Sequence, residues 1–360
     1  MTTNKFTAIL EEGIANFAAE EIEELLNLKS QTSLEQITFE ATNQELYKYL
    51  SHSQCAKQVL LNLWSGEDLS KVEFKLTKDL FQDKELSFLV EVIGIRGQDN
   101  RIELAKKIST PILSQAKSLE INLKLDYKKP QIKFILFFDQ EKYHLGIDLV
   151  GFEMNKRDYR LFPHQASFRG DVGFSIIKTI DYKAKEKLLI CFMKDSVLPI
   201  EAAIYATRAP LFKIKKMKIS SIPKFSDLEE FTPKRNEIKP QIFAFDEGMQ
   251  SFIASRKNAK LAKVEQDILT RKHKLDELDT KYKQNEMDKV VVFLTKKDEH
   301  KMNDIYHQVN FILKPSGKLL FVTRDNFEPT VHSKYHPVDT SMVTRGESTL
   351  LLTLLEKKAE

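Results

Sequence analysis

The sequence predicts a mixed α/β protein of two or three domains whose second half forms a mainly parallel sheet. The chain has 360 residues, more than one hydrophobic core usually spans. Its composition, 42% hydrophobic and 30% charged, is that of a folded globular protein rather than a disordered one. In the second half, short β-rich runs alternate with helical periodicities. That alternation is typical of parallel strands connected by helices that cover the sheet.

The first half shows two successive patterns of strands and helices. In residues 14–28 the apolar side chains recur at three- and four-residue steps, which predicts an amphipathic helix with an acidic outer face. From about residue 69 the pattern starts again, and Pro111 is expected to bend or divide its helix. The predicted strands are 6–10, 36–40, 87–95, 118–127, 131–139 and 143–152, and the predicted helices are 14–28, 43–50 and 101–116.

The second half carries the alternation that predicts the parallel sheet. Residues 207–240 interrupt it with a basic, proline-punctuated stretch, predicted as a long connection or an insertion within a domain. The predicted strands are 187–192, 241–246, 289–294, 318–324 and 348–357, and the predicted helices are 168–180, 199–206, 249–264 and 300–314.

Charge and composition exclude several classes of protein. No apolar run approaches the roughly 18 residues of a membrane helix, and the first five residues lack a secretory pattern. Cys55 and Cys191 each lie among apolar neighbours, which predicts buried free thiols and a cytoplasmic protein. Residues 1–70 hold 4 basic and 11 acidic side chains, whereas the rest hold 52 and 41. The excess of basic residues after residue 70 favours a polyanion-binding surface in that part of the chain.

Metal and nucleophile chemistry find no support in the residue spacing. His332 and His336 are four residues apart but lie in a loop- or strand-like stretch with no third ligand, so we interpret them as surface histidines and expect no metal. Ser196 follows no nucleophile-elbow pattern. The run GIRG (94–97) lacks the lysine and helix of a nucleotide loop.

Basic residues are the better candidates for a binding site. The run KIKKMK lies in the irregular connection, a second group surrounds residue 158, and a third falls at helical spacing. Cations of this kind meet phosphates with affinity but little sequence specificity. The candidate RNA contacts are Lys213, Lys215, Lys216 and Lys218 in the first group and Lys156, Arg157, Tyr159 and Arg160 in the second. The third group is Arg256, Lys257, Lys260 and Lys263.

The segment LGIDLVGFEMNKRDYRL (145–161) suggests a family. It resembles the strand that closes a THUMP domain, followed by the linker of THUMP-containing class I RNA methyltransferases. The matching residues are Gly146, Asp148, Leu149, Lys156, Arg157, Tyr159 and Arg160, while Asp158 replaces the usual glycine. Residues 199–206, 242–264 and 275–294 are similar to later motifs of that family. The resemblance covers nearly the whole chain and is to archaeal-type tRNA enzymes that methylate the exocyclic amine of guanine.

The chain departs from this family at both of its functional loops. Residues 190–197 align with a string like DPFCGSGT, with Lys194 and Ser196 in place of the glycines and Ile190 in place of the acid. Glycine lets the backbone approach a cofactor in conformations that side chains resist. The catalytic loop, like NPPY in the family, holds Phe293, Leu294, Thr295 and Lys296, with no asparagine and no proline. Asp246 remains at the position where family members bind the cofactor's ribose, but we interpret it as a strand-end or helix-capping carboxylate.

The resemblance implies an N-terminal ferredoxin-like plus THUMP module followed by a Rossmann-like class I methyltransferase-type sheet. The implied domains are a ferredoxin-like module at 1–68, a THUMP domain and linker at 69–165, and a degenerate Rossmann-like domain at 166–360.

The two replaced loops favour a catalytically inactive, RNA-binding platform. This hypothesis expects no catalytic residue and no cofactor, with Asp246 as a remnant, and takes structured RNA, tRNA in particular, as the partner. The alternative is an active S-adenosylmethionine-dependent tRNA guanine methyltransferase with divergent motifs. A third hypothesis is a subunit that positions a catalytic or homologous protein partner.

Overall fold

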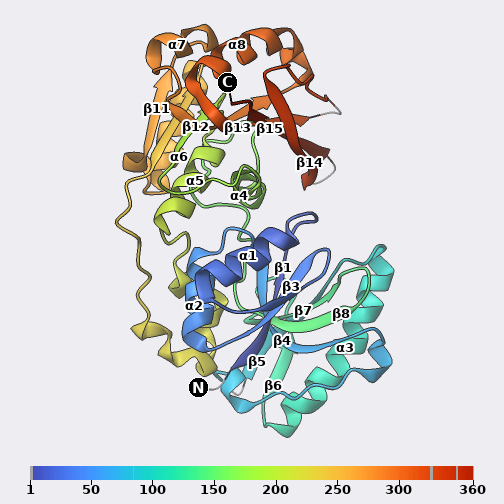
Figure 1. Cartoon of the computed structure of the whole chain (residues 1–360). Coiled ribbons are helices and arrows are strands. Elements are labelled where there is room, and N and C mark those ends of the chain that lie inside the picture. Colours follow the sequence, from blue (N-terminus) through green and yellow to red (C-terminus); the bar gives the residue numbers. More distant parts are fainter. Residues whose placement is uncertain (1–2, 84, 325–326, 346–347, 360) are drawn as a thin grey trace. The chain divides into compact units, whose positions relative to one another are not determined.

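The computed structural model of the chain describes residues 3–83, 85–324, 327–345 and 348–359. The chain divides into two compact units. Unit 1 comprises Met1–Met154 and Phe212–Pro233, and unit 2 comprises Asn155–Leu211 and Lys234–Glu360. Each unit is built around a sheet of its own, as Figure 1 shows.

Unit 1 contains a sheet whose described strands run in the order β2-β3-β1-β4-β8-β7-β5-β6. Neighbouring strands are antiparallel, except that β5 lies parallel to β6 and β7. The strands are β1 (Asn4–Ile9), β2 (Ser30–Thr32), β3 (Gln36–Ala41), β4 (Gln58–Gly66), β5 (Glu85–Ile93), β6 (Asn122–Leu125), β7 (Ile132–Phe138) and β8 (Tyr143–Asp148). Because β4 pairs with both β1 and β8, one continuous sheet spans the two predicted N-terminal modules. The predicted division at residue 68 stays a prediction.

The α-helices described in unit 1 are α1 (Ala15–Leu26), α2 (Asn43–His52) and α3 (Gln98–Ser118). Helix α2 begins at a capping box, in which Thr42 and Glu45 each bond the other's backbone N–H. Helix α3 continues through Pro111 and is not divided there. On either side of this proline the helix buries Ile108 and Ile112, so tertiary packing outweighs the one lost hydrogen bond.

The irregular connection proves to be partly an insertion that belongs to unit 1. It forms short 3-10 turns, which are η3 (Ile214–Lys216), η4 (Lys218–Ser221) and η5 (Pro223–Glu230). These turns pack against α2, where the Tyr47 ring contacts Phe225 and Phe231 edge-on and its hydroxyl donates to Asp227. The weakly periodic segment of the sequence is therefore an irregular chain that aromatic side chains hold against α2.

Unit 2 contains a sheet with the described strand order β11-β10-β9-β12-β13-β15-β14. The first five strands in this order are parallel, and β15 is antiparallel to both of its neighbours. The strands are β9 (Lys187–Cys191), β10 (Gln241–Asp246), β11 (Ile268–Lys272), β12 (Met287–Leu294), β13 (Leu313–Arg324), β14 (Tyr335–Arg345) and β15 (Ser348–Lys357). Residues 188–191 and 289–294 are buried throughout, as expected for strands covered on both faces.

Helices connect the parallel strands of unit 2, which has the doubly wound, Rossmann-like arrangement that the alternation predicts. They are α4 (Gly170–Thr179), α5 (Val197–Thr207), α6 (Met249–Leu261), α7 (Leu278–Lys281) and α8 (Met302–Ile312). Short 3-10 turns elsewhere in the chain are η1 (Leu69–Lys71), η2 (Lys78–Leu80), η6 (Glu265–Asp267), η7 (Leu275–Glu277) and η8 (Lys296–Lys301). Among the described residues, no helix combines the length and apolar character needed to cross a membrane.

Candidate functional site

The strand order of unit 2 identifies the edge of the sheet at which proteins of this fold bind ligands. Strand β9 lies between β10 and β12, so the connections from β9 and β12 leave the sheet on opposite sides. In open α/β sheets ligands bind outside the carboxyl ends of the strands at such a switch point. Three loops meet this edge: residues 192–196 after β9 (the first loop), residues 247–248 after β10, and residues 295–301 after β12 (the second loop).

The first loop keeps an unusual backbone without glycine. Phe192, Lys194 and Ser196 have φ angles of 60°, 53° and 69°, all in the left-handed region. Lys194 and Ser196 are the two positions where the resembled family has glycine. Left-handed backbone costs a non-glycine residue roughly 1–2 kcal/mol, so the surroundings must hold the loop in place. Two backbone hydrogen bonds do so: Met193 N donates to Phe245 O, and Lys194 N donates to the Asp246 carboxylate, each at 3.0 Å.

Asp195 anchors the first loop from inside the protein. Its buried carboxylate accepts hydrogen bonds from Arg160 Nε at 2.9 Å, from His164 N at 3.0 Å and from the Ser167 hydroxyl. The backbone oxygen of Asp195 accepts from Asn258 Nδ2 at 2.9 Å. This network fixes the loop to α6 and to residues 160–167, which precede α4.

Asp246 and His273 end the two strands on the other side of β9. The Asp246 carboxylate takes one backbone N–H on each oxygen, from Lys194 and from Gly248, which caps α6. A carboxylate offers about four acceptor positions, so two remain for a ligand. His273 follows β11, and its ring stacks on that of Phe245 with 4.2 Å between the ring centres. Burial lowers the pKa of His273, which keeps its imidazole neutral.

The hydrogen bonds of His273 leave one ring nitrogen available. The acceptor near Nδ1 is the Lys274 carbonyl oxygen at 2.9 Å, so Nδ1 carries the proton. Nε2 is then a bare acceptor, and it is buried with no hydrogen-bond partner in the described part of the chain. An unpaired buried acceptor is costly, which makes Nε2 a candidate ligand contact.

The second loop is more open and carries mainly charged side chains. Phe293 and Leu294 are buried in β12, so the predicted loop position reaches the surface only at Thr295 and Lys296. Thr295 and Asp298 form a capping box at the start of η8. Burial would raise the pKa of Asp298, but hydrogen bonds from Thr295 and the charges of Lys301 and Lys194 lower it below its usual value. Asp298 is therefore ionised at neutral pH.

The predicted RNA-binding residues around the linker are mostly committed to the interior of unit 2. Arg157 donates Nε and Nη2 to Glu201 at 2.9 and 3.1 Å, and the Tyr159 hydroxyl donates to the same carboxylate at 2.6 Å. Both side chains are buried, so they support α5 rather than forming a surface for phosphates. Arg160 pairs with Asp195. Of this group, Lys156 alone is exposed, and RNA contact stays a prediction for it.

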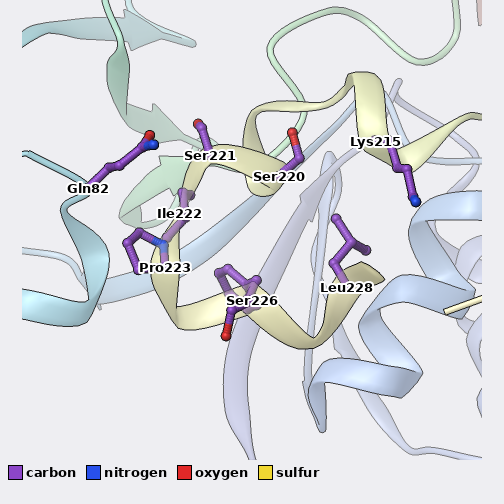
Figure 2. A pocket seen from close by; sticks show the side chains of 9 residues that line it. Gln82, Lys215, Ser220, Ser221, Ile222, Pro223, Ser226 and Leu228 are labelled. Carbon is purple, nitrogen blue, oxygen red and sulfur yellow. The ribbon is translucent and has the colours of Figure 1, made fainter. Parts of the chain in front are cut away.

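Two of the four predicted lysines of the insertion, Lys215 and Lys218, border neighbouring hollows in unit 1. One, of about 530 Å³, includes Lys215 and three serines in its lining. Figure 2 shows Gln82 across from Ser221 and Pro223 of the insertion, with Lys215 at the far end. Lys218 borders the second hollow, of about 220 Å³, and donates to the Pro130 carbonyl oxygen at 3.0 Å. Lys213 and Lys216 are exposed. Their contact with RNA also stays a prediction.

Sequence reasoning missed three residues of the crevice network, Asp195, Asn258 and His273. Asn258 gave a signal, because it falls on the inner face of an amphipathic helix, where a polar side chain needs a partner. Asp195 lies within residues 190–197, which align with the family's cofactor loop, but its hydrogen-bond partners are distant in sequence. Within the described residues, no group of three or more His, Cys, Asp or Glu side chains could hold a metal ion.

The chain is similar in sequence to proteins named as methyltransferases. No family model matches the chain. It is 24% identical over 292 residues to the ribosomal RNA large subunit methyltransferase K/L of Vibrio campbellii, covering 74% of this chain and 40% of that protein. It is 27% identical over 166 residues to the tRNA (guanine(6)-N2)-methyltransferase of Methanocaldococcus jannaschii, covering 42% of each. The chain thus spans about 40% of the length of the curated relatives it matches.

Solved structures share the fold over the whole chain. TrmN from Thermus thermophilus matches with a TM-score of 0.71 at 13% identity, covering 99% of this chain and all of that one. The protein SMU.472, described as a methyltransferase and complexed with SAH, matches with a TM-score of 0.74 at 14% identity, covering 100% and 99%. The predicted fold class, with a Rossmann-like class I methyltransferase-type sheet, is confirmed.

These comparisons overturn the prediction of a catalytically inactive platform. Both sequence relatives are named as methyltransferases of RNA, and a full-length structural match contains SAH. The prediction was wrong because it judged the first loop by its side chains alone. Non-glycine residues hold the left-handed backbone there, so the loss of both glycines does not remove the conformation. The expectation that no cofactor binds is not confirmed and loses its basis as well.

The residues at this edge fit S-adenosylmethionine, the methyl donor that the resemblance implies. Asp246 offers free acceptor positions to ribose hydroxyls at the end of β10. His273 offers a buried, unpaired acceptor to an amino group at the end of β11. The first loop supplies left-handed backbone at Lys194 and Ser196, the two positions that align with the family's glycines.

Proposed function

We propose that this chain is an S-adenosylmethionine-dependent RNA methyltransferase whose cofactor crevice is the carboxyl edge of β9, β10 and β12. One observation carries the proposal: the two positions at which the resembled family needs glycine, Lys194 and Ser196, have left-handed backbone here. A loop with no ligand to accommodate would be free to relax to the right-handed or extended conformations that these residues prefer.

The substrate that we favour is the exocyclic amine of a guanine in tRNA. The support comes from a relative named for that reaction and from the similarity of segment 145–161 to THUMP-containing tRNA enzymes. On this proposal, the modules at 1–68 and 69–165 hold the RNA, with Lys213, Lys215, Lys216 and Lys218 as phosphate contacts. The domain at 166–360 carries out the transfer.

The chemical roles divide between the cofactor and the chain. S-adenosylmethionine supplies an electrophilic methyl group when bound. Asp246 and His273 bind and orient the cofactor, since within the described residues the Asp246 carboxylate accepts two hydrogen bonds of about four possible and His273 Nε2 accepts none. No residue of 293–296 provides the family's asparagine. We assign its orienting task to Asp298, because this ionised carboxylate is fixed by Thr295 and accepts hydrogen bonds from an amine.

Calorimetric titration with S-adenosylmethionine and SAH tests the cofactor site. We expect the wild-type chain to bind both and Asp246→Ala to lose binding by roughly 100-fold, about 2.7 kcal/mol, because two charge-assisted hydrogen bonds are lost. Asp246→Asn, which keeps the shape of the side chain, should fall between them. Asp339→Ala, which removes an exposed carboxylate from β14, is the matched control and should bind as the wild type does.

Transfer of radiolabelled methyl groups to bulk tRNA and rRNA completes the test. Incorporation should follow the wild-type chain and Asp339→Ala, disappear in Asp246→Ala, and fall with Asp298→Ala while cofactor affinity is kept. Failure of the folded wild-type chain to bind either ligand at millimolar concentration would sink the proposed function.

A further inference from the structure

Helix α6 presents a surface that the cofactor crevice does not use. Helical spacing places Met249, Ile253, Lys257 and Lys260 on its outer face, opposite the buried Ser255, Asn258 and Ala259. Met249 and Ile253 are 53% and 46% exposed. The helix contains three basic residues and no acidic one. A surface helix usually places solvated, mixed charges on this face, so the combination of apolar and cationic side chains needs a reason.

An extended segment continues this surface beside the helix. Leu161 and Phe162 are 65% and 40% exposed. The segment is fixed to α6, because Phe162 N donates to Asn258 Oδ1 at 3.1 Å and Asn258 Nδ2 donates to Phe162 O at 3.0 Å. Lys257 Nζ lies 4.6 Å from the centre of the Phe162 ring. We call Leu161, Phe162, Met249, Ile253, Lys257 and Lys260 the α6 strip.

The α6 strip is bonded directly to the crevice. Asn258, which holds Phe162, also donates to the backbone oxygen of Asp195 in the first loop at 2.9 Å. At the other end, Gly248 caps α6 and donates to Asp246 at 3.0 Å. The helix that carries the strip is therefore fixed to two loops of the edge where the methyl donor is proposed to bind.

We propose that the α6 strip binds the single-stranded RNA that flanks the target nucleotide, an inference that rests on the proposed function. A base inside a duplex is out of reach of such a crevice, so its neighbours must unstack. Unstacked bases are held on aromatic and apolar side chains, and their phosphates meet cations. Phe162, Met249 and Ile253 supply the first kind of contact, and Lys257 and Lys260 supply the second. The absence of any acid on α6 selects a polyanion over an ordinary protein surface.

Fluorescence anisotropy with a labelled 12-nucleotide RNA, as a single strand and as a duplex, tests this proposal. Phe162→Ala should weaken single-strand binding about tenfold, the usual loss when a stacking ring is removed. Phe162→Trp should retain binding. Lys257→Glu with Lys260→Glu should weaken it and flatten the log–log salt slope by roughly 1.4, at about 0.7 for each phosphate of a single strand. Duplex binding should change less than twofold.

Matched controls distinguish RNA binding by the α6 strip from non-specific electrostatic and hydrophobic binding. Met249→Ser with Ile253→Ser should weaken single-strand binding severalfold, whereas Met342→Ser, at a methionine on β14 that is 69% exposed, should not. Lys185→Glu with Lys283→Glu reverses two exposed lysines elsewhere in unit 2. This control should weaken single-strand binding less than the reversal of Lys257 and Lys260 does. Equal losses from strip and control variants would overturn the proposal.

Two further readouts distinguish the possible failures. Affinity for S-adenosylmethionine should be unchanged in every strip variant. If the wild-type chain binds no S-adenosylmethionine but binds single-stranded RNA through the strip, the proposed function is refuted and RNA binding by the strip is not. An apolar and basic helix face can also bind an anionic membrane. Flotation with vesicles of phosphatidylglycerol and phosphatidylcholine should show no binding. Vesicle binding that depends on Met249 and Ile253, with RNA binding unmoved by them, would refute the RNA strip.

Discussion

The loops that follow β9 and β12 both lie at the carboxyl edge of one sheet and have both lost the residues typical of the resembled family, yet they differ in construction. The first loop (192–196) is buried at four of its five residues and is held by Asp195 and Asp246. The second loop (295–301) is largely exposed and is held mainly by its own capping box.

This difference shows which kind of sequence change a functional loop tolerates. In the first loop, tertiary hydrogen bonds hold a left-handed backbone on residues other than glycine. In the second loop the changed side chains alter the chemical groups offered to a substrate, and no backbone compensation restores them. We therefore expect the first loop to determine stability and cofactor binding and the second to determine what is methylated.

The largest effect should come from removing the buried anchor of the first loop. Asp195→Ala leaves Arg160 Nε and the His164 N–H without their acceptor, and should lower the free energy of unfolding of unit 2 by about 3 kcal/mol. Asp298→Ala removes the cap of the second loop and should cost only about 1 kcal/mol. Urea unfolding followed by circular dichroism measures both.

The single tryptophan helps to assign the unfolding transitions. Trp64 lies on β4, so tryptophan fluorescence reports unit 1, while circular dichroism reports both units. The Asp195→Ala shift should appear in dichroism and leave the fluorescence transition in place. Equal costs for the two aspartate variants would contradict the contrast between the loops.

A smaller effect concerns pH and the residue that ends β11. Because burial lowers the pKa of His273 in the folded state, the unfolded chain binds more protons below the ordinary histidine pKa of about 6.5. Its contribution to stability is thus present above pH 6.5 and is lost as the pH falls through that value toward the folded pKa. The loss at pH 5.5 is at most about 1.4 kcal/mol.

His273→Gln should therefore lose less stability than the wild type between pH 7.5 and pH 5.5. Unfolding of unit 2 in urea at both values provides the measurement. His144 in unit 1 shifts in the same direction through burial, so the unit 2 transition must be used. His300→Gln, at an exposed position in η8, should keep the wild-type dependence. A His273→Gln slope as steep as the wild type would refute the role of this buried imidazole.

Local patterns in the sequence predicted the alternating half of the fold well and failed where structure depends on distant partners. The parallel strands were predicted because continuous apolar runs such as 290–294 are typical of strands covered on both faces. Strand β4 was missed, although residues 59–61 are apolar, because no polar alternation marks it. That omission hid the sheet that joins the two N-terminal modules.

The site was predicted less well, for a physical reason. Arg157 and Tyr159 have the composition of an exposed RNA-binding linker, but their partner Glu201 lies more than 40 residues further along the chain. No spacing rule reveals such a pair. Likewise, the sequence shows that two glycines are missing, but only the structure shows that Lys194 and Ser196 have left-handed φ angles.

The smallest effect gives the sharpest contrast, because its sign should differ between the loops. Lys194→Gly relieves a left-handed residue, worth roughly 1–2 kcal/mol, while the freer unfolded chain takes back about 0.4–1 kcal/mol. It also loses the contact of the Lys194 ammonium with the Phe192 ring, worth about 0.5 kcal/mol at a partly exposed site. The net change should be neutral or slightly stabilising.

Lys297→Gly, in the exposed η8 turn of the second loop, relieves no left-handed backbone. It should destabilise unit 2 by about 0.5–1 kcal/mol, the usual cost of glycine in a helical turn. The dichroism transition in urea measures both variants. If Lys194→Gly costs as much as Lys297→Gly, then the surroundings do not strain the first loop. The left-handed backbone at Lys194 would then be no sign of a retained cofactor site, and the observation that carries the proposed function would fail with it.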